Sequence, residues 1–345
     1  YPLRRQRQMC IRDRITSAYE PDVFAVVRKV LSDIGYSSEG IAMDTFVHQQ
    51  SPDIAGAVDT SKERREGVSD NQMDWFQGAG DQGVMIGYAC DETKQLMPIP
   101  VVLANRIVRE LSACRQSSYI QGILPDGKAQ VTVEYENGKP VRLDSVVVSC
   151  QHTEDKNLKK LEAEIRKKVL LPALRLLPPD EDTKIFINPS GRFVCGGMDA
   201  DTGLTGRKLM VDSYGSMVPH GGGAFSGKDC SKVDRSVAYM ARYIAKNIVA
   251  ARLASRCQVS LAYAIGVAQP VMVQVDTFGT GKVCADDCLE LAIPLVFGLT
   301  PKQIVDSLRL TRPIFRQTAA FGHFGRKEFQ WERTDKVEAL RNAVI

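Results

Sequence analysis

The feature that most limits the fold of this chain is a pair of alternating segments joined by a two-residue turn. Apolar and polar residues alternate from Gln130 to Tyr135, and the return segment runs from Val141 to Ser149. Between them stands Asn137-Gly138, which favours a type I′ turn and therefore antiparallel pairing of the flanking strands. The sequence predicts a β-hairpin here, which argues against a doubly wound parallel sheet.

The rest of the chain mixes helical and strand patterns. Helices are expected where apolar residues recur at helical spacing, within 23–34, 96–115, 157–171, 231–254 and 301–311. Strands are expected at 41–48, 184–188, 258–266 and 271–277. Because strands are joined both by hairpins and across helices, the pattern indicates an α+β fold with antiparallel or mixed sheets. The polar stretch from Gln49 to Gly78 is expected to be a loop, either a lid or idle surface.

Composition excludes several classes of protein. Charged residues make up 25% of the chain and its net charge is +4, with basic and acidic residues interspersed, so a nucleic-acid-binding stripe is not expected. The longest apolar run, Leu291 to Leu299, is about half of a membrane span. Nine widely spaced cysteines indicate reduced thiols in a cytoplasmic protein. Cys284 and Cys288 form the one close pair, which is weak evidence for a metal site.

Residues 1–14 differ in character from the sequence that follows. They contain five arginines, no serine and no apolar core of a signal peptide. We interpret them as a segment that is not native to the protein, with a disordered basic arm as the alternative.

The densest candidate site is the segment from His220 to Asp229. Its three consecutive glycines, 221–223, would let backbone N–H groups approach an anion, and Lys228 adds a positive charge suited to phosphate. The spacing from Gly222 to Lys228 also fits a P-loop, but Asp229 stands where that loop needs Ser or Thr. A different triphosphate-binding loop is therefore favoured over a P-loop or a plain flexible loop.

Three neighbouring segments carry further candidates. Ser231 and Asp234 have the spacing of a capping box, although Asp234 could instead bind Mg²⁺ with Lys232 facing the substrate, and the two roles do not exclude each other. The second segment is Arg207-Lys208, which follows a glycine-rich turn and could clamp a polyphosphate, with Asp201 before it as a partner for an amino or ribose group; an ordinary turn is the alternative. The third is the glycine-rich 78–83 segment, where Asp81 is a candidate partner for an ammonium group.

Taken together, these segments resemble the S-adenosylmethionine synthetase (methionine adenosyltransferase) family. The matching strings occur in the family's order and are QSPDI at 50–54, GAGDQG at 78–83, LPDGKAQVTVEY at 124–135, FINPSGRFVCGG at 186–197, GLTGRK at 203–208, HGGGAFSGKDCSKVDRS at 220–236 and FGHFGR at 321–326. The resemblance implies a transferase that makes S-adenosylmethionine from ATP and methionine and releases phosphate and diphosphate. It also implies Mg²⁺ and K⁺ as cofactors, a homodimer or homotetramer with shared active sites, and a cytoplasmic location.

The resemblance implies a role for residues at the matching positions. The catalytic residues would be Lys228, Lys232 and Arg207, and the magnesium ligand would be Asp234. ATP would be bound by Asp126, Gly127, Lys128, Arg192, Phe193, Asp201, Arg207, Lys208, Ala224 and Lys228. Methionine would be bound by Gln50, Asp81, Asp201 and Lys232.

The implied fold has three similar α/β sandwich domains about a pseudo-threefold axis, with the first domain incomplete. Residues 15–77 would be its remnant with the lid loop, 78–193 the central domain and 194–345 the C-terminal domain.

The sequence departs from the family pattern in three respects. Two are mild: Gly127 stands where the family usually has Ala, and Ala200 where it has Gly. The third is the absence of the family's opening G-H-P-D-K motif, together with an acidic potassium ligand and a Gly-Glu pair that contacts methionine. We therefore expect an N-terminal truncation and an inactive 345-residue chain. A non-catalytic ATP-binding regulatory subunit is the alternative; an unrelated kinase would explain the glycine–lysine loop and none of the other strings.

Overall fold

The structure, a computed structural model, describes residues 14–16, 22–49, 51–67, 77–201 and 203–344. Their contacts define two compact units, one within residues 1–50 and 103–204 and the other within 51–102 and 205–345. One boundary between the units falls inside helix α4 (Ile99–Gln116), which matches the helix predicted over 96–115. The interpretation of 1–14 concerns residues that, apart from Arg14, lie outside the described part of the chain.

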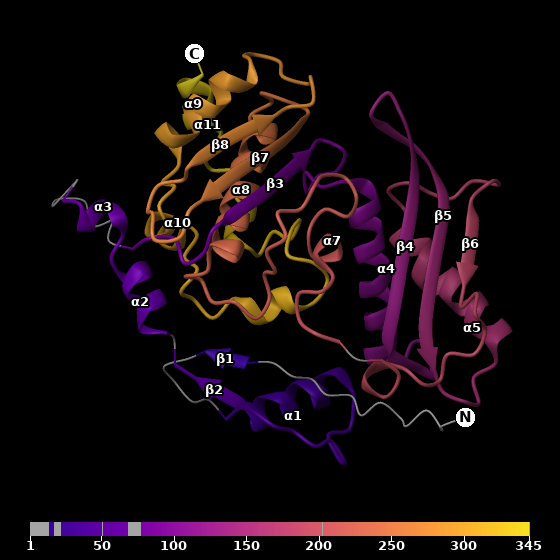
Figure 1. Cartoon of the computed structure of the whole chain (residues 1–345). Helices are drawn as coiled ribbons and strands as arrows, with labels where there is room; N and C mark the ends of the chain where they lie inside the picture. Colours follow the sequence, from indigo (N-terminus) through magenta and orange to yellow (C-terminus); the bar gives the residue numbers. More distant parts are fainter. Residues whose placement is uncertain (1–13, 17–21, 50, 68–76, 202, 345) are drawn as a thin grey trace, which may run out of the picture. The chain divides into compact units, whose positions relative to one another are not determined.

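The first unit contains the predicted hairpin (Figure 1). Strands β4 (Ile123–Glu136) and β5 (Lys139–His152) pair antiparallel. Asn137 and Gly138 between them have φ of 50° and 75°, as a type I′ turn requires. The hairpin prediction is therefore confirmed.

A third strand, β6 (Lys184–Ile187), lies parallel to β5 on its far side from β4. A parallel pair needs a crossover, and here it runs through α5 (Leu158–Ile165), a π-helical turn at Arg166–Leu170 and α6 (Leu171–Ala173). Before β6, Asp180 accepts two hydrogen bonds from the Arg142 guanidinium of β5, at 2.8 and 2.9 Å. This sheet is mixed, as the α+β prediction allowed.

The first unit also contains a helix that lies, in chain order, between two short strands, β1 (Arg14–Thr16) and β2 (Phe46–His48), which pair parallel. Helix α1 (Val23–Ile34) begins after Asp22, whose side chain accepts from the Ala25 N–H. It ends at Gly35, which has the left-handed φ of 103° expected for a C-terminal cap. The helix prediction is confirmed, whereas the strand expected over 41–48 is limited to its last three residues.

The second unit is built on an antiparallel sheet in the order β3-β7-β8 (Figure 1). Its strands are β3 (Gly83–Cys90), β7 (Arg256–Tyr263) and β8 (Met272–Asp276). Helix α8 (Val233–Ala250) packs against β3 and β7, and nearly all of its side chains are buried. Because this helix is covered on every side, it forms the centre of the unit's hydrophobic core.

Gly87 in β3 sets how closely α8 approaches the sheet. A Cβ placed on Gly87 would lie 2.0 Å from the Ala241 carbonyl carbon of α8. The nearest atoms all belong to the α8 backbone, which cannot move aside as the end of a flexible side chain could. We therefore expect Gly87→Ala to lower the free energy of unfolding by about 1 to 3 kcal/mol, measured by urea denaturation. Gly203→Ala is the matched control, since its Cβ would have nothing within 4 Å; an equal loss in both variants would contradict the close approach.

A buried ion-pair network joins α8 to the C-terminal part of the second unit. Arg242 donates to both carboxylate oxygens of Glu332 at 3.1 and 2.9 Å, and Lys246 donates to Glu332 Oε2 at 2.7 Å. The other Arg242 N–H groups reach the carbonyl oxygens of Tyr88, Gln95 and Leu96 at 2.7 to 2.9 Å. The network therefore ties α8, the end of β3 and the turn at Gln330–Glu332 to one another.

Six shorter α-helices also lie in the described part of this unit: α2 (Pro52–Asp59), α3 (Lys62–Arg65), α7 (Leu209–Asp212), α9 (Asp286–Val296), α10 (Pro301–Ser307) and α11 (Val337–Ala343). Helix α10 begins with a reciprocal capping box of Thr300 and Gln303, and Pro301 is its first residue. Within the described residues no single helix is long and apolar enough to cross a bilayer; one bent pair, α9 with α10, passes on length and composition alone.

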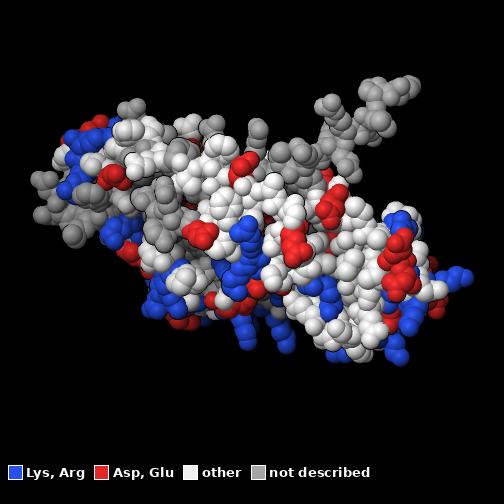
Figure 2. All heavy atoms as spheres, turned by 90° about the horizontal axis from the view of Figure 1, so that it is seen from below, with Lys and Arg blue, Asp and Glu red and all other residues white. Residues whose placement is uncertain are grey.

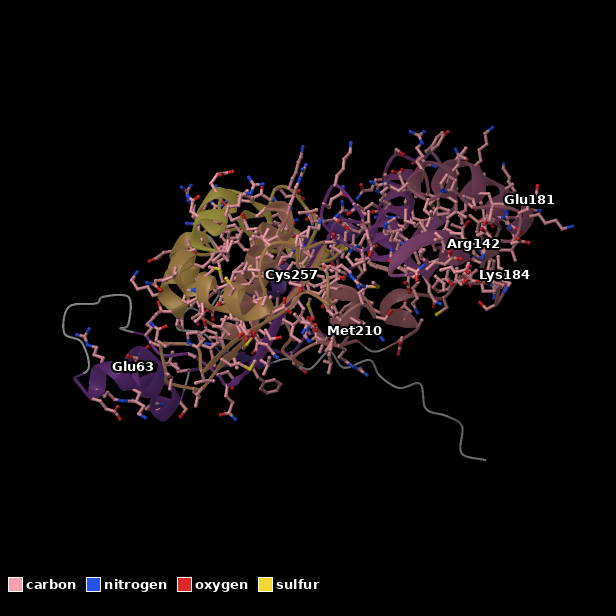
Figure 3. All side chains as sticks on the ribbon, turned by 90° about the horizontal axis from the view of Figure 1, so that it is seen from above. Glu63, Arg142, Glu181, Lys184, Met210 and Cys257 are labelled. Carbon is pink, nitrogen blue, oxygen red and sulfur yellow. The ribbon has the colours of Figure 1, made fainter. Side chains whose placement is uncertain are left out.

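The polar stretch predicted as a loop over Gln49–Gly78 contains helices α2 and α3, so the prediction is wrong for that part. Local capping explains the difference, because Pro52 occupies the first turn of α2 and Ser61 accepts from the Arg64 N–H at the start of α3. Glu63 also accepts from the Ala268 N–H at 2.9 Å, which holds α3 in place (Figure 3). Residues 68–76 lie outside the described part, and a lid role stays a prediction.

Candidate active site

The glycine loop of 220–228 lies in the second unit, against β3 and the first turn of α8. A Cβ on Gly221 would lie 1.6 Å from the Val84 carbonyl oxygen, and one on Gly223 would lie 2.2 Å from Asp234 Oδ1. Gly221 therefore requires glycine for close backbone approach, and Gly223 leaves room for the Asp234 carboxylate. A small cavity adjoins the loop and is lined by Val84, Met85, Ile86, His220, Gly221, Gly223, Phe225, Asp234 and Ala238.

Lys228 and Asp234 form an ion pair beside this loop, with Lys228 Nζ 2.6 Å from Asp234 Oδ2. The Asp234 side chain is only 13% exposed, so the pair is largely shielded from water. Helix α8 begins at Val233, its N-cap residue is Lys232, and it has no side-chain cap. The predicted Ser231–Asp234 capping box is therefore wrong: the Asp234 carboxylate faces Lys228 and Gly223 and does not serve a helix cap.

The predicted basic clamp lies next to the glycine loop. Gly206 has φ of 77°, and a Cβ on it would lie 2.4 Å from the Ala224 Cβ, while one on Gly227 would lie 3.4 Å from Thr205 Cγ2. The 205–208 segment therefore runs beside 224–227. Arg207 and Lys208 are exposed there, as a pair that recruits an anionic ligand must be. Basic and acidic residues intermingle on the face in Figure 2.

The segment that carries Asp81 also approaches the start of α8. A Cβ on Gly80 would lie 3.4 Å from the Ser231 carbonyl oxygen and 3.9 Å from Lys232 Cδ. Asp81 is exposed, and its carboxylate accepts from the Gln82 N–H at 2.8 Å. Two residues predicted to bind methionine, Asp81 and Lys232, thus belong to adjacent segments of one unit. Of the other two, Gln50 lies outside the described residues and Asp201 belongs to the first unit.

The remaining predicted residues gather in the first unit. Asp126 stands early in β4, where Asp126 Oδ2 accepts from the Gly197 N–H at 2.9 Å. Asp201 donates its N–H to the Gly197 carbonyl at 3.2 Å, so the glycine-rich turn at 197–201 lies beside Asp126. Burial and the neighbouring Asp126 carboxylate together raise the pKa of Tyr36. Gly127 and Lys128 follow in β4, opposite Cys150 and Ser149 of β5, and both are exposed.

His152 holds Phe193 to the end of β5 by two hydrogen bonds. Its N–H donates to the Phe193 carbonyl at 2.9 Å, and its ring Nε2 accepts from the Phe193 N–H at 3.0 Å. Arg192 beside it forms an exposed ion pair with Glu154. The structure thus brings the predicted ATP-binding residues together as two groups, one within each unit.

Sequence reasoning missed a buried polar group beneath the glycine loop. Arg235, Tyr239 and His323 are all buried there, and His323 lies 3.3 Å from the Ser226 hydroxyl of the loop. Arg235 and His323 both belong to matched strings, yet the position of His323, 97 residues from Ser226, gave no sign of contact.

Comparison with known proteins gives the same family from both parts of the chain. The sequence models for the central and the C-terminal domain of S-adenosylmethionine synthetase match residues 76–193 and 195–333. An S-adenosylmethionine synthase of Parafrankia sp. (strain EAN1pec) is 52% identical, over 98% of this chain and 87% of the relative. One of Desulforudis audaxviator (strain MP104C) is 51% identical, over 96% and 86%. The chain therefore belongs to the S-adenosylmethionine synthetase family of ATP-binding transferases.

Proposed function

We propose that this protein transfers the adenosyl group of ATP to methionine. The observation that supports this best is the convergence, within the second unit, of the glycine loop, the Lys228–Asp234 pair and the 205–208 segment. In the reaction, the methionine sulfur attacks C5′ of ATP and displaces triphosphate, which is then hydrolysed to phosphate and diphosphate. Because sulfur is already nucleophilic, the protein has to position the reactants in line and neutralise the leaving triphosphate.

The loop would bind the triphosphate. The open backbone at 221–223 offers N–H groups, and Lys228, Arg207 and Lys208 supply positive charge, so Lys228 and Arg207 would stabilise the charge that develops on the leaving group. Ala224 would line the nucleotide. Lys228 is paired with Asp234, so we propose that its ammonium group turns from Asp234 to a phosphate oxygen when the triphosphate binds.

Asp234 fits a magnesium ligand by the chemistry of its surroundings. It is one shielded carboxylate, with Oδ1 facing the position that the missing side chain of Gly223 leaves open. Mg²⁺ commonly binds through one or two protein carboxylates together with substrate phosphates. The ion would supply charge neutralisation on the triphosphate; a requirement for K⁺ is proposed from the family alone.

The other predicted residues would complete the two substrate sites. Asp126, Gly127, Lys128, Arg192, Phe193 and Asp201 would bind ATP, and Gln50, Asp81, Asp201 and Lys232 would bind methionine, with Lys232 catalytic. Asp201 would contact the substrates across a subunit interface, so we propose a homodimer or homotetramer with shared active sites. The domain division at 77/78 and 193/194 and the pseudo-threefold arrangement of three similar domains belong to the same proposal.

The test is to separate binding from turnover. We expect the 345-residue chain by itself to bind inorganic triphosphate, measured by calorimetry with Mg²⁺. Because it contains no G-H-P-D-K motif, we also expect it to form no detectable S-adenosylmethionine from ATP and methionine with Mg²⁺ and K⁺. Losing even one preorganised group that stabilises a transition state typically costs about 100- to 1000-fold in rate. Failure to bind triphosphate would overturn the proposed function, and turnover at an ordinary enzymatic rate would show that the motif is dispensable.

The alternative is a non-catalytic ATP-binding regulatory subunit of the same family. It predicts a different outcome, because such a subunit would stay inactive even when the chain is extended at its N-terminus with the family motif. Product formation by the extended chain would therefore favour the transferase.

A further inference from the structure

A network of hydrogen-bonded polar groups contacts the second half of the glycine loop. Arg235 Nε donates to the Tyr239 hydroxyl at 3.0 Å, and that hydroxyl lies 2.8 Å from His323 Nδ1. His323 Nε2 in turn lies 3.3 Å from Ser226 Oγ, within the loop. Arg235, Tyr239 and His323 are 3%, 0% and 1% exposed, so these contacts are made out of water, where an unpaired polar group is costly.

The same hydrogen-bonded network also holds Lys228, whose side chain faces the candidate phosphate site. A terminal nitrogen of Arg235 donates to the Lys228 carbonyl oxygen at 2.6 Å, and the other donates to Thr318 Oγ1 at 2.7 Å. Ser226 and Lys228 are therefore both held by hydrogen bonds to this buried network. Gly227 between them has φ of 87°, which lets the backbone turn between the two anchors.

A consistent direction can be assigned to these hydrogen bonds. If the Tyr239 hydroxyl, which accepts from Arg235, directs its own hydrogen to His323 Nδ1, the ring hydrogen of His323 lies on Nε2 and donates to Ser226 Oγ. Burial, with the cations Arg235 and Arg326 nearby, lowers the pKa of His323 to about 3. The ring therefore stays neutral near pH 7 and keeps one acceptor and one donor nitrogen.

We propose that Arg235, Tyr239 and His323 are positioning residues that hold Ser226–Lys228 in the conformation that binds triphosphate. The inference rests on the proposed function of the glycine loop. An ordered loop has less conformational freedom to lose when an anion binds, so the anchors raise affinity without touching the ligand. They act through the Ser226 side chain and the Lys228 carbonyl.

The first test is calorimetric titration of the 345-residue chain with inorganic tripolyphosphate and Mg²⁺. Ser226→Ala and Tyr239→Phe are each expected to weaken binding by about 3- to 10-fold, the usual effect of one hydrogen bond. Because both changes interrupt the same hydrogen-bonded network, the double variant should bind triphosphate about as weakly as the weaker-binding single variant. Ser307→Ala is the matched control, since its hydroxyl donates to the Ile304 carbonyl within α10 and its loss should leave binding unchanged.

The second test separates positioning from packing at His323. In His323→Gln the side-chain amide reaches the place of Nε2 and can still donate to Ser226, whereas in His323→Asn it reaches only the place of Nδ1 and keeps Tyr239. Both variants shorten the buried ring to a similar degree, so we expect similar melting temperatures but about 3-fold tighter triphosphate binding for Gln than for Asn. The ¹⁵N NMR spectrum of the unaltered protein should show hydrogen on Nε2 of His323.

The outcomes distinguish the two levels of inference. If the unaltered chain binds no triphosphate, the proposed function fails and the positioning role fails with it. If the unaltered chain binds but Ser226→Ala and Tyr239→Phe bind equally well or show additive losses, only the positioning role is overturned. Equal binding by the Gln and Asn variants would also overturn it alone.

Discussion

Replacing Asp234 with Asn is expected to abolish the effect of Mg²⁺ on triphosphate binding. A neutral amide is a poor ligand for a hard cation, so affinity for tripolyphosphate in the presence of Mg²⁺ should fall by about 10- to 100-fold. In a form of the protein that turns over, the rate should fall by about 100- to 1000-fold. Without Mg²⁺, Asp234→Asn should strengthen triphosphate binding or leave it unchanged, because the substitution frees Lys228 from its 2.6 Å ion pair. Calorimetry with and without Mg²⁺ measures both effects.

The structure also excludes the loss of a helix cap as an explanation for the effect of Asp234→Asn. Since the N-cap of α8 is Lys232 and Asp234 makes no cap bond, any loss of stability in Asp234→Asn comes from the ion pair with Lys228 and from the acidic charge in the first turn, and not from a helix cap. Asp306→Asn in α10 is a matched control, because it neutralises an exposed helical aspartate paired with Lys302. Unaltered magnesium dependence in Asp234→Asn would exclude a metal role for this residue.

Replacing Glu332 with Gln is expected to give the largest loss of stability. Glu332 accepts from Arg242, Lys246 and the Gly325 N–H, and the Glu332 and Arg242 side chains are both fully buried. Removing one partner of such a network leaves the other charges uncompensated in the interior, which typically costs about 3 to 5 kcal/mol. Urea denaturation followed by far-UV circular dichroism measures this loss. Glu338→Gln, which removes an exposed partner of Arg341, should cost at most about 1 kcal/mol.

The same network makes stability depend on pH. Burial alone would raise the pKa of Glu332, but the Arg242 and Lys246 cations outweigh it, and the pKa lies below its usual value. A lowered pKa in the folded state gives stability that is complete above the ordinary glutamate pKa of about 4.3 and is lost as the pH falls through the folded value. The stability difference between the unaltered protein and Glu332→Gln should therefore narrow below about pH 4. A difference that stays constant to pH 3 would contradict an ionised Glu332.

Local signals in the sequence predicted several elements correctly. The hairpin at Asn137-Gly138 and the helices α1 and α4 were all predicted from residues only a few positions apart. The same kind of signal failed at Ser231 and Asp234. Their spacing fits a cap, yet α8 begins one residue after Lys232 and the carboxylate turns to Lys228. A spacing rule cannot weigh a cap against a nearby ammonium group, and here the shielded charge pair prevails.

The sequence by itself determined the family, the candidate ligand residues and the elements whose signals are local, because each depends on residue type at short spacing. Tertiary structure alone decided which of those residues meet. Gly206 lies against Ala224 and Gly80 against Ser231, while His323 reaches Ser226 across 97 positions and Glu332 reaches Arg242 across 90. Such pairs are selected by the packing of α8 on its sheet and by the need to satisfy every buried polar group, and neither requirement can be read from a window of sequence.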